Sequence, residues 1–291
     1  MTSLRARLGH EIFQRVAGPD GPRQRDRIHG TPGPRWFSDD SEIVRVHGDA
    51  AMFVGGIRAI LLQTMHPLAM QAVADHSGFR GDMWGRLART STFLAVTTFG
   101  TADHADGAVR AVRSIHERVR GTMPDGTPYA ASDPHLLAWV HAAQVDSFLL
   151  AHQTYGARPL DAAGCDAYLA QAAVVARKLG VLDPPTTVDQ LRRVLDDFRP
   201  ELRATDEARS AVRFLALHPD LPLAAQPAYG VLFAAGIGLL PRWVRRPLRL
   251  PSLPVTERTV VRVLGTLATG TIRWAMSSGA DEVRELRSAA S

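Results

Sequence analysis

Apolar residues recur along this chain at helical spacing, in segments separated by proline and glycine. No series of short strands with alternating apolar and polar residues interrupts these segments. We therefore expect an all-α fold, built as a single-domain helical bundle. Helices are predicted over residues 3–16, 41–48, 50–65, 67–74, 84–98, 105–120, 134–155, 161–179, 187–199, 205–217, 229–239 and 256–276.

Proline, glycine and arginine dominate residues 18–34, which we interpret as a mobile connector after the first helix. No internal repeat and no linker long enough to separate two domains is visible. The expected organisation is an N-terminal helix with its connector (1–34), one helical domain (35–280) and a C-terminal tail (281–291).

The composition is that of an ordinary globular protein, with 45% apolar and 22% charged residues among 291. Lys178 is the only lysine, so arginine supplies almost all of the 34 basic groups against 29 acidic ones. This net charge of +5 suggests a polyanionic partner, but the interspersed acidic residues argue against a nucleic-acid groove. A local cluster, Arg242, Trp243, Arg245 and Arg246, is a candidate for peripheral contact with an anionic membrane.

Cys165 is the single cysteine, which excludes an intrachain disulfide and a cysteine-based zinc or iron–sulfur site. The N-terminus lacks the apolar core of a signal peptide. The longest apolar run, residues 229–240, is shorter than the roughly 20 residues that span a bilayer. We expect a cytoplasmic protein.

Eleven histidines are the main chemical resource, and no two of them lie three to five residues apart. The two-histidine zinc helix is therefore absent, and a hydrolytic zinc site is not expected. The phosphate-binding loop, the dinucleotide-binding glycine pattern and the nucleophile elbow are absent as well.

Some polar residues instead interrupt apolar helix faces. His116 shares a stripe with Val112, and His141 shares one with Phe148. Such a histidine is usually a hydrogen-bonded core residue. The alternative is a pocket for an apolar cofactor that carries one metal and some anionic groups, which haem would fit. A third face combines Arg86, Thr90, Phe93 and Thr97, with Arg89 beside it.

A series of ordered motifs lies between residues 40 and 155: VRVHGD (44–49), GGIRA (55–59), LLQTMHPLA (61–69), HSGF (76–79), WGRLART (84–90), TTFG (97–100), VRSIHERVRG (112–121), YAASDP (129–134), LAWVHA (137–142) and DSF (146–148). Together they resemble the MpaB and latex-clearing-protein oxygenase family, in its actinobacterial branch. Residues 233–246 extend the resemblance more loosely.

The resemblance implies an all-helical, globin-like core with additional helices that binds haem b. Relatives cleave isoprenoid double bonds with O2, so an oxygenase acting on an apolar, isoprenoid or lipid-like substrate is implied, with an unidentified electron donor. The alternative is a noncatalytic helical protein that binds a lipid or small molecule and has lost haem chemistry.

By its motifs, the resemblance assigns the axial iron ligand to His116 and the role of a supporting core histidine to His141. The distal element falls on Arg86, Arg89 and Thr90, which we assign to the reaction with oxygen. Arg89 stands where the family has lysine, and arginine cannot ligate iron as a neutral base.

The cofactor side also includes His66, His76 and Arg58; either histidine could instead hold a helix end or loop. Arg58 interrupts an apolar helix and needs an anionic partner, because an unpaired buried guanidinium costs several kcal/mol. A haem propionate, Asp49 and Asp75 are its candidates.

Overall fold

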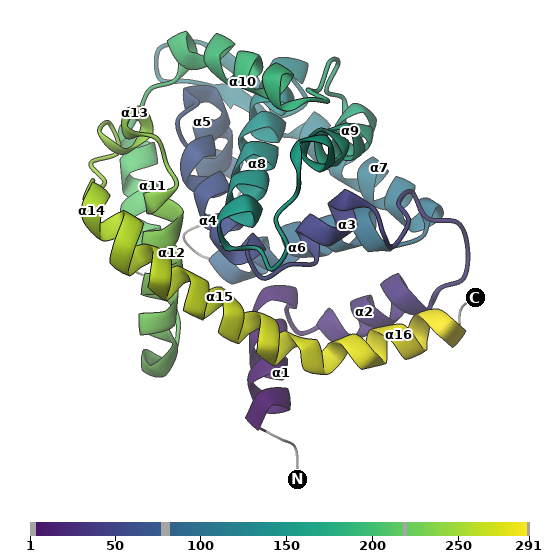
Figure 1. The fold of residues 1–291 in the computed structure, drawn as a ribbon. Helices are drawn as coiled ribbons and strands as arrows, with labels where there is room; N and C mark the ends of the chain where they lie inside the picture. Colours follow the sequence, from purple (N-terminus) through teal and green to yellow (C-terminus); the bar gives the residue numbers. More distant parts are fainter. Residues whose placement is uncertain (1–3, 77–81, 218–219, 290–291) are drawn as a thin grey trace.

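The computed structural model describes residues 4–76, 82–217 and 220–289 and confirms the all-α class (Figure 1). Ser77, Gly78 and Phe79 of the family motifs, and His218, lie outside the described residues. In chain order the helices are α1 (Leu4–Ala17), α2 (Gly21–Gly30), α3 (Glu42–His47), α4 (Met52–Gln63), α5 (Pro67–His76), α6 (Met83–Phe99), α7 (Ala102–Arg118), α8 (Pro134–Tyr155), α9 (Ala162–Leu179), α10 (Val188–Asp197), α11 (Asp206–Leu217), α12 (Gln226–Gly238), α13 (Arg242–Arg245), α14 (Pro254–Thr256), α15 (Arg262–Met276) and α16 (Ala280–Ala289). Short 3₁₀ turns are η1 (Arg199–Glu201), η2 (Leu223–Ala225) and η4 (Ser277–Gly279), and a π-helical turn, η3 (Glu257–Val261), precedes α15.

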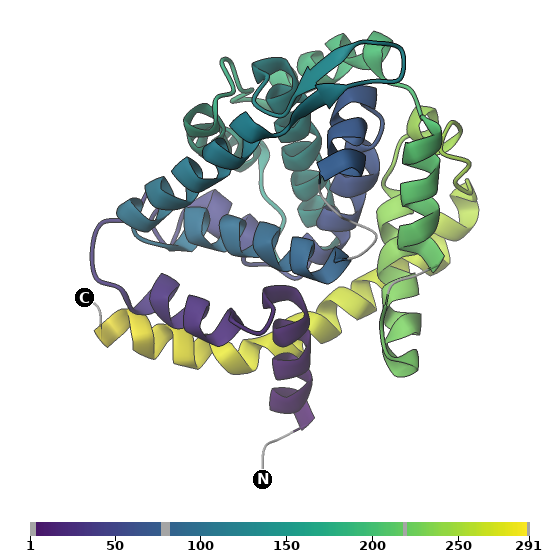
Figure 2. The same ribbon diagram turned by 180° about the vertical axis from the view of Figure 1, so that it is seen from behind.

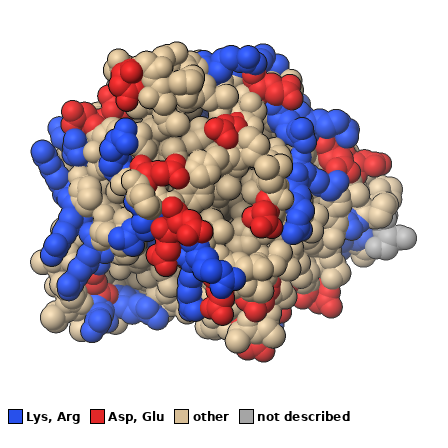
Figure 3. All heavy atoms as spheres, turned by 90° about the horizontal axis from the view of Figure 1, so that it is seen from above, with Lys and Arg blue, Asp and Glu red and all other residues tan. Residues whose placement is uncertain are grey.

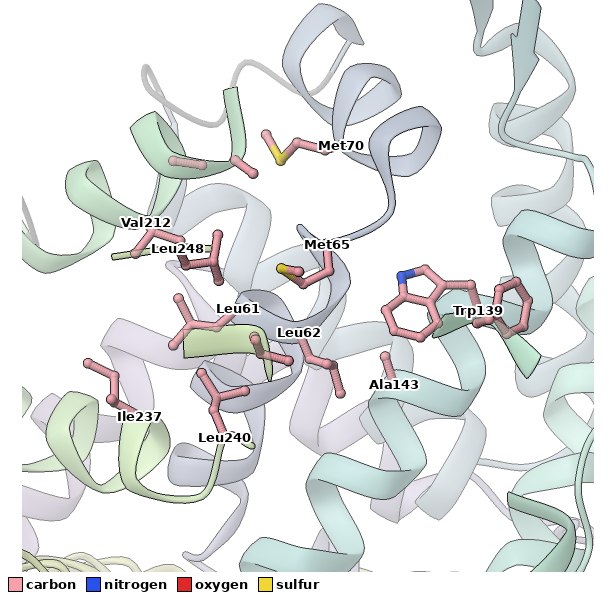
Figure 4. Close-up of a cluster of buried hydrophobic side chains, with 14 of the residues drawn as sticks. Leu61, Leu62, Met65, Met70, Trp139, Ala143, Val212, Ile237, Leu240 and Leu248 are labelled. Carbon is pink, nitrogen blue, oxygen red and sulfur yellow. The ribbon is translucent and has the colours of Figure 1, made fainter. Parts of the chain in front are cut away.

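Helices α4 and α8 form the centre of the molecule and share its most extensive helix contact. Gly55 permits their close approach, because a Cβ atom at this position would lie 3.2 Å from the Cα of Phe148. On one side of the pair, Leu61 and Leu62 meet the α12 residue Ile237 and the neighbouring Leu240 in a large apolar cluster (Figure 4). The nearly apolar segment of the sequence is thus the central buried helix, as expected.

Both ends of the chain pack on the helical body and on each other. The segment that we interpreted as a mobile connector contains α2, which lies beside α16 (Figures 1 and 2). Pro22 occupies the first turn of α2, where proline is tolerated, and Ile28 is buried. Arg25 pairs with Glu282 of α16 at 2.6 Å. This helical segment therefore packs against a partner more than 250 residues away in sequence.

A small hairpin follows α7, which ends two residues earlier than predicted. Its strands, β1 (Arg120–Thr122) and β2 (Pro128–Ala130), are antiparallel, with Gly121 opposite Tyr129. The Tyr129 ring lies against Gly121 so closely that a side chain there would collide with it. These three-residue strands are too short to leave an alternating pattern in the sequence.

Candidate functional site

Helices α6 and α7 pack together near the turn that joins them and diverge from it (Figure 2). Their fully buried residues gather at this turn: Thr97 and Thr98 on α6, and Ala105 and Val109 on α7. Farther from the turn, both helices carry only half-buried or exposed side chains, apolar ones such as Phe93 included. The diverging halves thus present a mixed apolar and polar surface that the surrounding chain covers incompletely.

His116 lies in the last turn of α7, on this incompletely covered half. Burial lowers the pKa of His116, so that its imidazole is neutral at pH 7. Its Nδ1 is buried and has no hydrogen-bond partner among the described residues. The hydrogen-bonding capacity of this nitrogen is therefore left for a group outside the described residues.

His141 lies on α8 beside the fully buried Ala142 and Ala143. Burial lowers its pKa to about 4. Its Nε2 is buried, again without a hydrogen-bond partner in the described part of the chain. Both histidines that the sequence placed on apolar stripes are thus neutral and incompletely hydrogen-bonded.

His47 shows the contrasting case of a fully engaged core histidine. Its Nδ1 lies 2.8 Å from the Thr98 hydroxyl and its Nε2 lies 3.4 Å from the Tyr168 hydroxyl. Burial lowers the pKa of His47 to about 3. The ring joins α3 to α6 and α9, which is a structural role.

The three residues of the expected distal element occupy different environments on α6. Arg86 is half-buried, and burial, followed by repulsion from Arg89, lowers its pKa. The Arg89 side chain is 66% exposed and pairs at 3.0 Å with Asp82, the N-cap residue of α6. The Thr90 hydroxyl is exposed and donates to the Arg86 carbonyl at 3.0 Å. Burial therefore singles out Arg86 as the inward-lying member.

Arg58 has the anionic partner that its burial requires, but the partner is neither carboxylate that we named. Its guanidinium lies 2.7 Å from Asp146 and also donates to the Ser147 hydroxyl and the Leu239 carbonyl. Asp49 pairs instead with Arg273 at 2.8 Å, and Asp75 accepts a 2.6 Å hydrogen bond from Tyr129. Asp146 is an acidic residue within the long, mostly apolar α8, as Arg58 is a basic residue within the apolar α4. Two opposite charges on two buried helices are the signal that could have suggested this pair.

His66 and His76, both expected on the cofactor side, have other neighbours. His76 Nε2 lies 3.1 Å from the Tyr129 hydroxyl, at the end of α5. His66 lies beside His135 and Glu201, and the three donor atoms are within 4.8 Å of one another. Sequence reasoning missed this group, because its members are more than 60 residues apart.

The proposed membrane-contact cluster is only partly accessible. Arg242 and Arg246 are exposed, whereas Arg245 is buried and pairs with Glu257 at 2.6 Å. The guanidinium of Arg199 covers the Trp243 ring, 4.1 Å from its centroid. Within the described ranges, no helix has both the length and the apolar character needed to cross a membrane.

His116, His141 and Arg86 each have the side-chain chemistry that a haem group requires. Haem requires a neutral imidazole for its iron, apolar walls, and cations for its carboxylates. His116 and His141 each offer a neutral ring with a buried, unpartnered nitrogen, and α6 offers incompletely covered apolar side chains and Arg86. A lysine ligand is not available from the only lysine, Lys178, because it pairs at 2.7 Å with Asp106, near the start of α7 and away from His116.

Comparison with known proteins identifies relatives over part of the chain. Two uncharacterized proteins, Mb2261 of Mycobacterium bovis and Rv2237 of Mycobacterium tuberculosis, are each 32% identical over 139 residues. The match covers 45% of this chain and 54% of each relative, so the chain spans about half the length of these curated proteins. No solved structure matches the chain.

A family model matches a much longer stretch, residues 44–274. This range contains every residue of the candidate site, and the mycobacterial relatives agree with the expected actinobacterial branch. The chain belongs to the family described as the catalytic domain of ER-bound oxygenase mpaB/B' and rubber oxygenase.

Proposed function

We propose that this protein is a haem b-dependent oxygenase that acts with O2 on an apolar, isoprenoid or lipid-like substrate. Family membership supports an oxygenase-type role and points to a metal or haem cofactor. The observation that carries the haem assignment is the pair of neutral imidazoles, His116 and His141, each with a buried nitrogen that lacks a partner among the described residues. A satisfied core histidine such as His47 has no such nitrogen.

When bound, haem supplies an iron centre that activates dioxygen. His116 would hold the iron, since its burial favours the neutral, ligating form. Arg86 would stabilise negative charge that develops on oxygen, and as an arginine it stays protonated throughout the working pH range. The half-buried apolar residues of α6 would exclude water and hold the substrate, and His141 would shape the pocket.

Titration of the purified 291-residue chain with hemin tests this proposal. Binding to the wild type should convert the broad absorption of free hemin into a sharp, shifted Soret band, and His116→Ala should lose this band. His10→Ala removes an exposed imidazole from α1 and should bind hemin as the wild type does. Loss of the band in His141→Ala but not in His116→Ala would move the axial role to His141, and a wild type without a Soret shift would reject haem binding.

The arrangement of Arg89 favours a second function, noncatalytic binding of a lipid or other small apolar molecule in the same region. Arg89 replaces the family lysine, and its side chain pairs with Asp82 at the surface. Native mass spectrometry of freshly isolated protein separates the two functions: a bound haem mass supports the oxygenase, and a lipid mass without haem supports the alternative.

A further inference from the structure

Three potential metal ligands from distant segments converge outside the proposed haem site. His66 lies between α4 and α5, His135 lies in the first turn of α8, and Glu201 ends η1. His135 Nε2 is 2.9 Å from both carboxylate oxygens of Glu201, and His66 Nε2 is 3.5 Å from one of them. The three donor atoms can therefore surround a single ion.

His66 is the buried member of this group. Its side chain is only 3% exposed, and neither ring nitrogen has a hydrogen-bond partner among the described residues. The rings of Trp139 and Phe198 lie 6.4 and 6.2 Å from its ring centroid and offer no acceptor for these nitrogens. Burying a polar atom without a partner is unfavourable, so the nitrogen aimed at Glu201 is a position that a cation would satisfy.

The backbone around the cluster fixes these positions without help from an ion. The Arg203 amide donates to the Met65 carbonyl at 2.9 Å, which holds the end of η1 against the end of α4. The Trp139 indole donates to the Gln63 carbonyl at 3.3 Å, which holds α8 against the same segment. The donor set is thus largely preformed.

We propose that His66, His135 and Glu201 form a zinc site. Two imidazoles and one carboxylate are a ligand set that zinc commonly takes, with a fourth position left for water or another ligand. The side chains of His135 and Glu201 are 55% and 44% exposed, so this fourth position faces solvent. The ion would link the α4–α5 junction, the start of α8 and the segment between α10 and α11.

A chelator-stripped sample of the 291-residue chain, titrated with Zn²⁺ in competition with a chromophoric chelator, tests the site. The wild type should bind one equivalent. His135→Ala and Glu201→Gln change exposed side chains, so the fold should persist, and each should weaken zinc binding at least about tenfold. His10→Ala, which removes an exposed histidine elsewhere, should bind as the wild type does.

Two further measurements separate this site from the haem site and from a simple hydrogen bond. His116→Ala should keep its zinc, whatever it does to hemin binding. Excess Zn²⁺ should raise the Tm of the wild type but not that of Glu201→Gln. Zinc stabilises the folded state only where the intact site binds it. A wild type that binds no zinc, or variants at 135 and 201 that bind it unchanged, would show that Glu201 only accepts a hydrogen bond from His135.

Discussion

At the scale of single residues, the buried Arg58 needs its acidic partner, Asp146, for the fold to be stable. We expect Arg58→Met to lower the free energy of unfolding by about 3 kcal/mol, because it leaves the Asp146 carboxylate without its cation. Urea denaturation measures the change. Arg89→Met is the matched control: it breaks an exposed pair with Asp82 and should cost less than about 1 kcal/mol. Equal losses of unfolding free energy in the two variants would contradict the view that the Arg58 pair matters because it is buried.

The buried histidines predict how stability depends on pH. Burial lowers the pKa of His47 from 6.5 to about 3 and that of His141 from 6.5 to about 4. Below pH 6.5 the unfolded chain therefore binds protons that the folded chain does not. Stability should be full above this pH and fall as the pH approaches 4, by about 1 to 2 kcal/mol per histidine near pH ~5.

Urea midpoints measured across this pH range test the sign. His47→Gln should show a shallower decline than the wild type, since one of the groups that is protonated only on unfolding has been removed. A midpoint that rises on acidification from neutral pH would be incompatible with neutral buried imidazoles.

At the scale of elements, two adjacent glycines of α4 give a matched test of the central helix contact. A Cβ at Gly55 would lie 3.1 to 3.3 Å from atoms of Phe148 and Ala151, one of them backbone, whereas a Cβ at Gly56 would meet nothing within 4 Å. Gly56→Ala should therefore stabilise the protein by up to about 1 kcal/mol through helix propensity. Gly55→Ala should be less stable than Gly56→Ala by about 1 to 3 kcal/mol, because α4 and α8 must separate. Thermal and urea unfolding of both variants provides the comparison.

Local signals predicted most helices but not every element. The bounds of α8 match the prediction, because Asp133 caps its first turn and Pro134 can only begin a helix. The sequence 18–34 has the composition of a linker, yet it contains α2, which packs on α16. In the hairpin after α7, the Tyr129 ring packs on Gly121 of the opposite strand. Composition carries no information about such partners.

At the scale of the whole molecule, the chain ends act together. α1 packs on α15 and α6, and α16 packs on α2 (Figure 1). Arg23 and Arg27 of α2 are already exposed, but they lie in a helix, which trypsin cleaves slowly. Deleting residues 280–291 removes the helix that packs on α2, so α2 should unfold locally more often and become a better substrate. We expect faster cleavage within α2 than in the wild type, detected by mass spectrometry of the fragments. Glu282→Gln, which removes only the charge facing Arg25, should leave the cleavage rate nearly unchanged.

The whole molecule also shows where the basic side chains lie. On the face seen in Figure 3, basic side chains gather along the left edge, whereas toward the middle and right they lie among acidic ones. Arg58 and Arg245 are buried in ion pairs with Asp146 and Glu257. These two of the 34 basic groups are therefore neutralised inside the fold and add nothing to a basic surface.

The sequence by itself determined the helical class, the central apolar helix, the family resemblance and the two inward histidines, because each depends on periodicity, capping or contiguous motifs. Tertiary structure decided which side chains meet. Only the fold showed that Arg58 pairs with Asp146, that Arg89 lies at the surface, and that His66 joins His135 and Glu201. Such contacts join positions far apart in sequence, and local spacing cannot encode them because the packing of whole helices sets the distances.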